Sequence, residues 1–460
     1  MALLLKGCAA LPTPEAPPTV ALPERFAAQA APAAAQKAPE GPWWLAFGDQ
    51  GLDRAVTQVL AQNLDLEQAR LRVEQSRALA SQAVARTRPR MDVGASASVN
   101  RLSSQTAPAK APGFDANTRS VGADLTASWE PDFFGRTAAV VAAETARAQA
   151  SEADNAALAL SLSAETARRV IELRSLQEQD RLAAKAVQLE QDLVAVAEAQ
   201  LRGGAVNQAD VWRARAQLQS AQASRDRLAG SMADALQALA VLLATTPSSA
   251  ATTVGEAAMP KPRGLGAFAE TPAQVLARRP DVAAAKFRLA AASADLAATA
   301  AERFPRVNLL ASVGMAATSL ATLGTTDALL ATLAPSLAWR ALDFGELDAA
   351  VAGRKATEQA AAAAYKQTVL AAFADAETAL ARVAARQAEW DAALQAVHTQ
   401  REVRDLAQLR FERGVGALST ALEALRVVNQ LERERLESQQ ALAVAVVEVY
   451  RATMAGTAVP

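Results

Sequence analysis

The sequence has little of the chemistry that enzymes and metal sites use. Among 460 residues it contains one cysteine, Cys8, and one histidine, His398, and only 4% are aromatic. A single cysteine excludes an intrachain disulfide, and a single histidine leaves few groups for metal binding or proton transfer near neutral pH. We therefore expect no enzymatic activity, no catalytic residue, no metal site and no cofactor.

A charge imbalance is also absent. The formal net charge is −1, so no basic surface for nucleic acid is indicated. Ala, Leu, Gln, Glu and Arg dominate most of the chain, which favours long helices. Residues 137–201 and 355–413 contain neither proline nor glycine, so each segment is long enough for a helix of about 90–100 Å.

The second of these segments carries a heptad pattern. Its members recur at alternating spacings of three and four: Phe373, Ala376, Leu380, Val383, Gln387, Trp390, Leu394 and Val397. Arg382, Arg386, Glu389 and Asp391 lie off this seam. Such a stripe must pack against another helix, and by itself it leaves a soluble coiled coil or antiparallel bundle open.

Long hydrophobic runs are rare, and the one that stands out is a strand pattern. Between Val307 and Trp339 the only formal charge is Asp327, which at first suggests a pair of membrane helices. However, large apolar residues alternate with polar or small ones, and a period of two is typical of β-strands. We expect Val307, Leu309, Ala311, Val313, Leu333, Leu337 and Trp339 on the apolar face and Asn308, Ser312, Thr332 and Ser336 on the polar face.

A second segment, at about residues 90–131, repeats this alternation. It places Asp92, Asp124, Arg119 and Glu130 among its polar residues, and charges at such intervals are incompatible with a pair of membrane helices. The sequence therefore predicts two β-hairpins, at about 90–131 and 305–341. A soluble hairpin packed on helices is the alternative.

The two hairpins belong to an internal duplication. Residues 59–73 align without gaps on 275–289 at an offset of 216, and beyond the hairpins Trp129 aligns with Trp339 and Gly204 with Gly414 at an offset of 210. We expect an N-terminal linker (1–41), a first repeat (42–245), an inter-repeat linker (246–271) and a second repeat (272–460). Each repeat would contain a helix, a hairpin and a long helix pair, with tips at about 201–210 and 410–420.

Four strands in one chain do not form a closed sheet. In lipid, each unpaired backbone group at a sheet edge costs several kcal/mol, so other copies of the chain must complete the sheet. Two copies give eight strands, whose interior is filled by side chains, and three give twelve, which leave room for a channel.

The extreme N-terminus resembles the end of a bacterial lipoprotein signal. The run Leu5-Lys-Gly-Cys8-Ala would make Cys8 the acylated first residue, although Lys6 fits poorly. The apolar part before it is too short for a complete signal peptide. We expect lipidation of Cys8, and the alternative is a plain cysteine in a disordered tail.

Several motifs together resemble the outer membrane factor family, which is similar to TolC, and within it the NodT/OprM-like efflux lipoproteins. They are Trp43-Trp44-x-x-Phe47-x-Asp49 with Leu52-Asp53, Asn63-x-Asp65-Leu66, Ser128-Trp129-Glu130-x-Asp132-x-Phe134-Gly135-Arg136, Arg278-Arg279-Pro280-Asp281-Val282, Phe304-Pro305 and Asp343-Phe344-Gly345. The resemblance spans nearly the whole chain from Trp43.

This resemblance implies an α+β membrane protein with a TolC-like fold. A trimer would form a twelve-stranded transmembrane β-barrel, four strands per protomer, that continues into a long α-helical coiled-coil barrel in the periplasm. The implied function is the passive exit duct for small molecules in the outer membrane of a tripartite efflux system. The implied partners are two further copies, a periplasmic adaptor, an inner-membrane pump of RND type and outer-membrane lipid. The alternatives are a type I protein secretion duct and a coiled-coil structural or adaptor protein of the cell envelope.

The resemblance also implies where the periplasmic end narrows. The family's leucine ring falls on Ser419, its acidic ring on Glu423 and a neighbouring aromatic position on Leu418. Because serine replaces leucine, Leu418 is the alternative apolar residue of the aperture. The tips that carry Gly204, Asn207, Asp210, Gly414 and Gly416 are candidate adaptor contacts, with Asn207 or Ser419 as helix caps. Ordinary helix turns and a solvated Glu423 are the alternatives.

Overall fold

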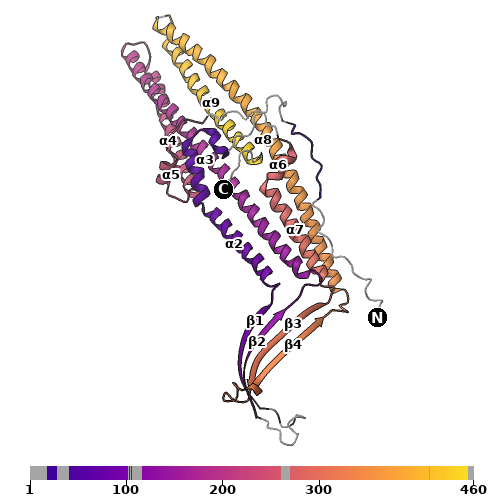
Figure 1. Ribbon diagram of the computed structural model, residues 1–460. Helices are drawn as coiled ribbons and strands as arrows, with labels where there is room; N and C mark the ends of the chain where they lie inside the picture. The colour runs from indigo at the N-terminus through magenta and orange to yellow at the C-terminus, as the bar shows by residue number, and fades with distance from the viewer. Residues whose placement is uncertain are drawn as a thin grey trace. The chain divides into compact units, whose positions relative to one another are not determined.

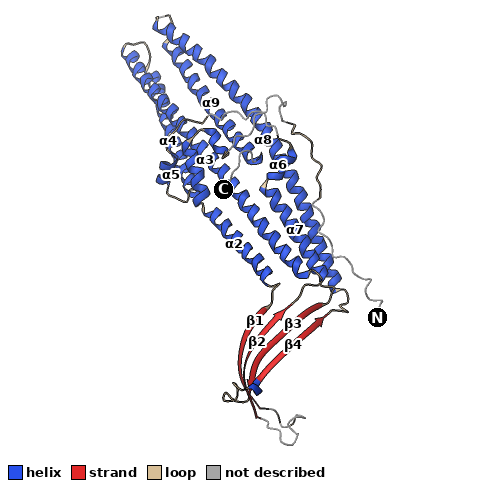
Figure 2. Ribbon diagram, viewed as in Figure 1, coloured by secondary structure: helices blue, strands red, loops and turns tan. Residues whose placement is uncertain are grey.

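Long helices and one sheet make up this computed structural model, which describes residues 18–27, 41–101, 103, 105, 117–260, 270–413 and 415–453 (Figures 1 and 2). Its contacts define two compact units. The first consists mainly of Arg72–Ser151 and Ala284–Lys366, and the second of Val20–Leu71, Glu152–Ala283 and Gln367–Pro460. The units cut across the two predicted repeats, whose boundaries stay a prediction.

The elements follow one another in a similar order in each half. The first half contains η2 (Trp43–Phe47), α1 (Gln50–Gln62), α2 (Leu64–Ala85), β1 (Arg90–Arg101), β2 (Asn117–Trp129), α3 (Arg136–Arg202), α4 (Gln208–Leu242) and α5 (Pro247–Val254). The second contains α6 (Pro272–Arg278), α7 (Pro280–Ala301), β3 (Arg306–Ala317), η4 (Thr326–Ala328), β4 (Leu329–Ala338), α8 (Glu346–Glu412) and α9 (Leu418–Thr453). The two long helices that the sequence predicts are confirmed as α3 and α8, each of 67 residues.

Within the described residues no single helix has the length and apolar character of a membrane span. In the part of the chain that the structure describes, α4 and α5 taken together, bent by 92° at their junction, are the one pair that meets this test of length and composition.

The four strands form one antiparallel sheet in the order β1-β2-β3-β4, in which all neighbours pair directly (Figure 1). The register aligns the alternation from strand to strand, because Val93 pairs with Leu125 and Leu125 pairs with Val313. One face therefore carries the predicted apolar residues of all four strands, including the pairs of Val307 with Leu337 and Ala311 with Leu333.

The opposite face is polar only in part. On β1 and β2 it carries Asp92 opposite Thr126, and Ser98 opposite Ser120. On β3 and β4 it carries Asn308 opposite Ser336 and Ser312 opposite Thr332, as predicted, but also Gly314 opposite Leu330 and the half-exposed Leu310. The expectation of a uniformly polar or small face is therefore wrong at Leu310 and Leu330. Strand alternation assigns a face to each residue but does not require its polarity.

The heptad seam of α8 packs as predicted. Its eight residues, from Phe373 to Val397, are all buried or half-buried, whereas Arg382, Arg386, Glu389 and Asp391 are exposed. Phe26 stacks on Phe373 with ring centroids 5.6 Å apart, and it belongs to a small core with Val275 and Val449. The seam thus contacts the N-terminal segment as well as other helices.

The main core of the second unit surrounds η2 and α1. Trp43 is fully buried and stacks on Tyr450 of α9. Beside this core, Arg174 of α3 is fully buried, and its Nε donates to Oδ2 of Asp49 at 2.8 Å. Its Nη atoms donate to the carbonyl oxygens of Val254 and Gly255. One guanidinium therefore connects α3, the start of α1 and the end of α5.

The pKa of Asp49 reflects this surrounding. Burial raises the pKa of the carboxyl, but the hydrogen bonds and charge of Arg174, with the backbone amides of Leu52 and Gly51, outweigh that effect and hold the pKa below its ordinary value. The carboxylate is therefore charged at neutral pH and also serves as the N-cap of α1.

A symmetric contact repeats at the junctions of the second unit. Asn63 precedes α2, and its Nδ2 donates to the carbonyl of Leu242 at 2.9 Å. Arg279 corresponds to Asn63 at the 216 offset and precedes α7, and its Nη1 donates to the carbonyl of Ala452 at 3.0 Å. Leu242 and Ala452 themselves correspond at the 210 offset, so different side chains make the equivalent contact in both halves.

Candidate functional site

The first helix-hairpin tip joins α3 to α4 through a short turn. Gly204 has a φ of 70°, a conformation that glycine adopts without strain, and its amide donates to the carbonyl of Leu201. Asn207 and Asp210 form a capping box, in which each side chain accepts from the backbone amide of the other at 3.0–3.1 Å. The prediction that Asn207 caps the outgoing helix is confirmed.

The second tip joins α8 to α9 and is built differently. Ser419 lies inside α9, after Leu418, so the prediction that Ser419 caps this helix is wrong. The residue that aligns with Asn207 at an offset of 210 is Ala417, which has no side-chain acceptor. Gly416 lies close to α8, because a Cβ there would be 3.0 Å from Cβ of Arg410. Gly414 lies outside the described residues.

Of the predicted aperture residues, Glu423 has the clearest electrostatic environment. It lies in the second turn of α9, its side chain is 69% exposed, and its Oε2 is 3.9 Å from Nη1 of Arg426. Ser419 is also exposed. Leu418 begins α9, and its side chain lies outside the described residues.

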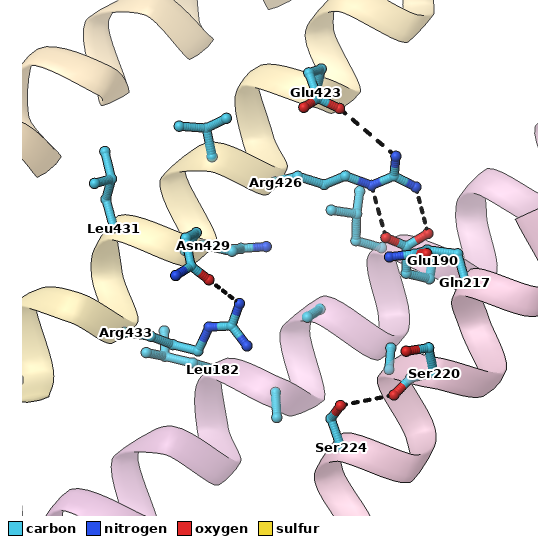
Figure 3. A pocket seen from close by; sticks show the side chains of 16 residues that line it. Leu182, Glu190, Gln217, Ser220, Ser224, Glu423, Arg426, Asn429, Leu431 and Arg433 are labelled. Atoms are coloured by element: carbon cyan, nitrogen blue, oxygen red, sulfur yellow. Dashed lines mark hydrogen bonds and ion pairs between the residues drawn. The ribbon is translucent and has the colours of Figure 1, made fainter.

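Arg426 connects α9 to α3. Its Nε and Nη2 donate to the two carboxylate oxygens of Glu190 at 3.0 and 2.9 Å, and Figure 3 shows the guanidinium between Glu190 and Glu423. The hydrogen bonds of Glu190 raise the pKa of Arg426, against an opposing effect of burial. The Glu190 side chain is only 6% exposed, so Arg426 supplies the partner that a buried carboxylate requires.

These residues line an open groove of about 520 Å³ between α3, α4 and α9. The other labelled residues of the groove are Leu182, Gln217, Ser220, Ser224, Asn429, Leu431 and Arg433 (Figure 3). Two carboxylates, Glu190 and Glu423, share Arg426, so this triplet carries a net negative charge. Among the described residues, no group of three His, Cys, Asp or Glu side chains could hold a metal ion.

Two ion pairs between distant segments of the chain were not predicted from the sequence. Glu190 and Arg426 are separated by 236 residues, and Asp49 and Arg174 by 125. Asp49 is part of a recognisable motif, but neither arginine carries a local signal. The family resemblance points to Glu423 in this groove but gives no sign of the buried Glu190 beside Arg426.

An apolar-faced sheet with two open edges, combined with long paired helices, defines the class of an outer-membrane channel with a periplasmic helical portion. The chain belongs to the outer membrane efflux protein family, whose sequence profile matches residues 55–245 and 271–454. Members of this family are channels rather than enzymes.

Individual relatives agree with this assignment. The pyoverdine export outer membrane protein OpmQ of Pseudomonas putida is 30% identical over 426 residues, which cover 92% of this chain and 89% of OpmQ. The probable outer membrane lipoprotein SilC of Salmonella typhimurium is 26% identical over 446 residues, 95% of this chain and 92% of SilC. The solved structure of the outer-membrane channel OprN has a TM-score of 0.86 at 28% identity, covering 96% of this chain and 98% of OprN. The expected TolC-like fold and outer-membrane efflux role are confirmed.

Proposed function

We propose that this chain is the passive exit duct of a tripartite efflux pump, in which a periplasmic adaptor joins it to an inner-membrane pump of RND type. The observation that carries the proposal is the sheet, since its apolar face is continuous across four strands and, among the described residues, no further strand pairs with β1 or β4 at its edges. Lipid contacts the apolar face, and the cargo, small molecules delivered by the pump, passes along the other.

Conductance tests the channel directly. Purified trimer in a planar bilayer should pass ions without ATP or any other energy source. A different result is a trimer that inserts into the bilayer and conducts nothing, even when Arg426→Gln weakens the packing near the periplasmic tips. That result would contradict the proposal that the chain forms a duct. Cells that lack the gene should also accumulate the pump's cargo, and a plasmid copy should restore its export.

The ion pair between Arg426 and Glu190 is our candidate for the contact that holds the hairpin of α8 and α9 against α3 in a closed state. In Arg426→Gln the buried Glu190 loses its charged partner, and an unpaired buried charge is strongly unfavourable. The closed packing should weaken and the conductance should rise. Arg433→Gln alters a second arginine of the groove and provides the matched control. Equal conductance in the wild type and Arg426→Gln would argue against this role of the ion pair.

Glu423 is our candidate for ion selection at the aperture. Because Arg426 is shared with Glu190, the charge of Glu423 is not cancelled locally, and three copies in a trimer would favour cations. Glu423→Gln should lower the ratio of cation to anion permeability. Glu437→Gln removes an exposed carboxylate from the same helix and should leave that ratio unchanged. An unaltered ratio in Glu423→Gln would mean that Glu423 is only a solvated surface residue.

The two hairpin tips are proposed as adaptor contacts, through the turns that contain Gly204, Asn207 and Asp210 and Gly414 and Gly416. Gly204 and Ala205 of the first turn and Ala417 of the second are exposed, and small exposed residues allow a partner helix to approach closely. A photo-reactive residue at the exposed Ala205 should cross-link to the adaptor in cells. The same group at Leu45, exposed on η2, tests specificity. Equal cross-linking at both positions would contradict contact through the tips.

Lipidation of Cys8 is proposed from the Leu5-Lys-Gly-Cys8 run, and the lipoprotein SilC among the relatives supports it. Cys8 lies outside the described residues. Mass spectrometry of the mature protein should find an acylated Cys8 as the first residue. An N-terminal peptide that retains Met1, or an unmodified Cys8, would exclude lipidation.

A further inference from the structure

The structure contains, within one chain, a junction between equivalent elements of the two halves. Phe134, just after β2, stacks on Phe304, just before β3, with ring centroids 4.9 Å apart and an interplanar angle of 9°. Beside this pair, β2 and β3 form nine registered residue pairs, from Val121 with Ala317 to Trp129 with Leu309. This internal junction shows how the end of the first hairpin packs against the start of the second.

The structure also confirms the offsets that relate the halves. Arg90 pairs with Ser128 in the first hairpin, and Arg306 pairs with Ala338 in the second. Arg306 corresponds to Arg90 at the 216 offset, and Ala338 corresponds to Ser128 at the 210 offset. Positions up to the first strand of each half therefore correspond at 216, and positions from the second strand onward correspond at 210.

The outer edges of the same elements show what is missing in one chain. Phe344, which corresponds to Phe134, is 93% exposed, against 38% for Phe134. It also has a φ of 50°, which is strained for a bulky residue, and no such φ occurs at Phe134. On the other edge, Val84 of α2 is 40% exposed, whereas the corresponding Ala300 of α7 is 6% exposed. Both edges thus lack the neighbour that their counterparts have.

We propose that a second copy of this chain supplies that neighbour, with β4 pairing to the partner subunit's β1 in the register of β2 with β3 and Phe344 packing on the guanidinium of the partner's Arg88. The partner position follows from the offsets, because Arg88 corresponds to Phe304. The inference rests on the trimeric channel and adds the residues that form its seam.

The register is fixed by the same correspondence. β4 corresponds to β2 at the 210 offset, and β1 corresponds to β3 at the 216 offset. The pair of Trp129 with Leu309 within one chain therefore predicts a pair of Trp339 with Val93 of the partner subunit. Likewise, the pair of Ala127 with Ala311 predicts a pair of Leu337 with the partner's Ala95. All four residues lie on the apolar face, so the alternation continues across the seam without a change of face.

The proposed contact of Phe344 with the partner's Arg88 differs in chemistry from the pair of Phe134 with Phe304 inside one chain. Inside the chain two phenyl rings stack, whereas at the seam an arginine meets the ring. A planar guanidinium stacks on an aromatic face and is attracted by its quadrupole. Arg88 is exposed in the single chain and directly precedes Pro89 and β1, so it lies at the edge that the partner must approach.

Cysteine cross-linking tests the register. Leu337→Cys combined with Ala95→Cys should form a disulfide between subunits on oxidation in the membrane, because directly opposite residues lie within the permitted Cα distance. Leu337→Cys with Ala97→Cys is the matched control. Ala97 lies on the same face one pleat further along, a diagonal position beyond that distance, so cross-linked product should be about tenfold lower. Variants that carry only one of the introduced cysteines measure any cross-link that the native Cys8 forms.

Either of two results overturns the register: a stable trimer in which the Ala97 combination cross-links better, or one in which neither combination does. A chain that forms no trimer, and so no cross-link, refutes the trimeric channel as well, and native mass spectrometry of the uncross-linked protein distinguishes these cases.

Substitution tests the contact with Arg88. Phe344→Ala and Arg88→Ala should each lower the temperature at which the trimer dissociates by several degrees, and the double variant should be no worse than the less stable single variant. Arg88→Phe should retain most of the wild-type value, since it recreates the internal pair. Phe133→Ala and Arg86→Ala, which change exposed neighbours, are the controls. Additive losses in the double variant, or losses equal to the controls, would refute the contact.

Discussion

Trp129 and Trp339 form the same hydrogen bond in the two halves of the chain. Nε1 of Trp129 donates to the carbonyl of Thr87 at 3.0 Å, and Nε1 of Trp339 donates to the carbonyl of Arg303 at 3.0 Å. Thr87 and Arg303 correspond at the 216 offset, and the tryptophans at 210. Each bond fixes the end of a strand to the turn that follows a helix.

Removing one of these indole donors should cost a measurable part of the stability. Trp339→Phe retains the ring but leaves the carbonyl of Arg303 without this donor, and we expect a loss of about 1 kcal/mol. Thermal unfolding in detergent measures the change. Trp212→Phe alters an exposed tryptophan of α4 and should have little effect. Equal losses in both variants would show that the bond contributes nothing specific.

The pairing of β2 with β3 should depend on glycine at position 314. A Cβ on Gly314 would lie 2.5 Å from the carbonyl oxygen of Ala123 and 2.8 Å from Cα of Asp124, both backbone atoms. Gly314→Ala should therefore separate the strands and reduce the yield of folded trimer. Gly324→Ala is the control, because a Cβ there meets open space. A normal trimer yield from Gly314→Ala would contradict this close approach.

Loss of Arg174 should be severe. It leaves Asp49 as an unpaired buried charge and removes the donor to two carbonyl groups, and we expect Arg174→Leu to cost about 3–5 kcal/mol. Chemical denaturation measures this loss. Arg181→Leu removes an exposed arginine of the same helix and should cost far less. Comparable losses in both variants would mean that the buried pair is not a major source of stability.

The same pair predicts a dependence on pH. The folded-state pKa of Asp49 lies below its ordinary value of 3.8, so its contribution to stability is complete above that value and is lost as the pH falls through the folded pKa. The difference in stability between wild type and Asp49→Asn should therefore be constant from neutral pH to about pH 5 and shrink in more acidic solution. A difference that grows in acid would contradict the lowered pKa.

The first tip should lose local order when its cap is removed. Asn207→Ala deletes the side-chain acceptor for the amide of Asp210 and should destabilise the first turn of α4 by about 1 kcal/mol. Faster hydrogen exchange at that turn provides the measurement. Ser419→Ala, inside α9, should leave exchange at the second tip nearly unchanged. Unchanged exchange in Asn207→Ala would show that the capping box is dispensable.

Much of the fold follows from local patterns in the sequence. The two segments without proline and glycine became α3 and α8, and the period-two alternation gave the face of Leu125, Val313 and Leu333 correctly. These features were predictable because they depend on residues close together in the chain. The internal duplication predicted that the two halves contain equivalent elements, and it predicted that Trp129 and Trp339 occupy equivalent positions.

The rest depends on contacts between distant segments. Nothing near Arg174 or Arg426 indicates which carboxylate each will bind, because those partners are brought together only by helix packing. The second tip was misjudged since Ser419 has the right chemistry for a cap but lies one residue inside the helix. Leu310 and Leu330 occupy positions that the alternation assigns to the polar face, so the alternation predicts their face but not their apolar character.

The uneven polarity of the sheet has a consequence for the wall of the channel. Around a ring of three chains, the wall built from β1 and β2 offers serine, threonine and aspartate, whereas the wall built from β3 and β4 offers Leu310 and Leu330 beside its serines and asparagine. Polar sectors and partly apolar sectors would then alternate around the wall of the trimeric channel. Such a wall differs from a uniformly hydrated one, because it offers apolar contacts as well as hydrogen bonds along the same passage.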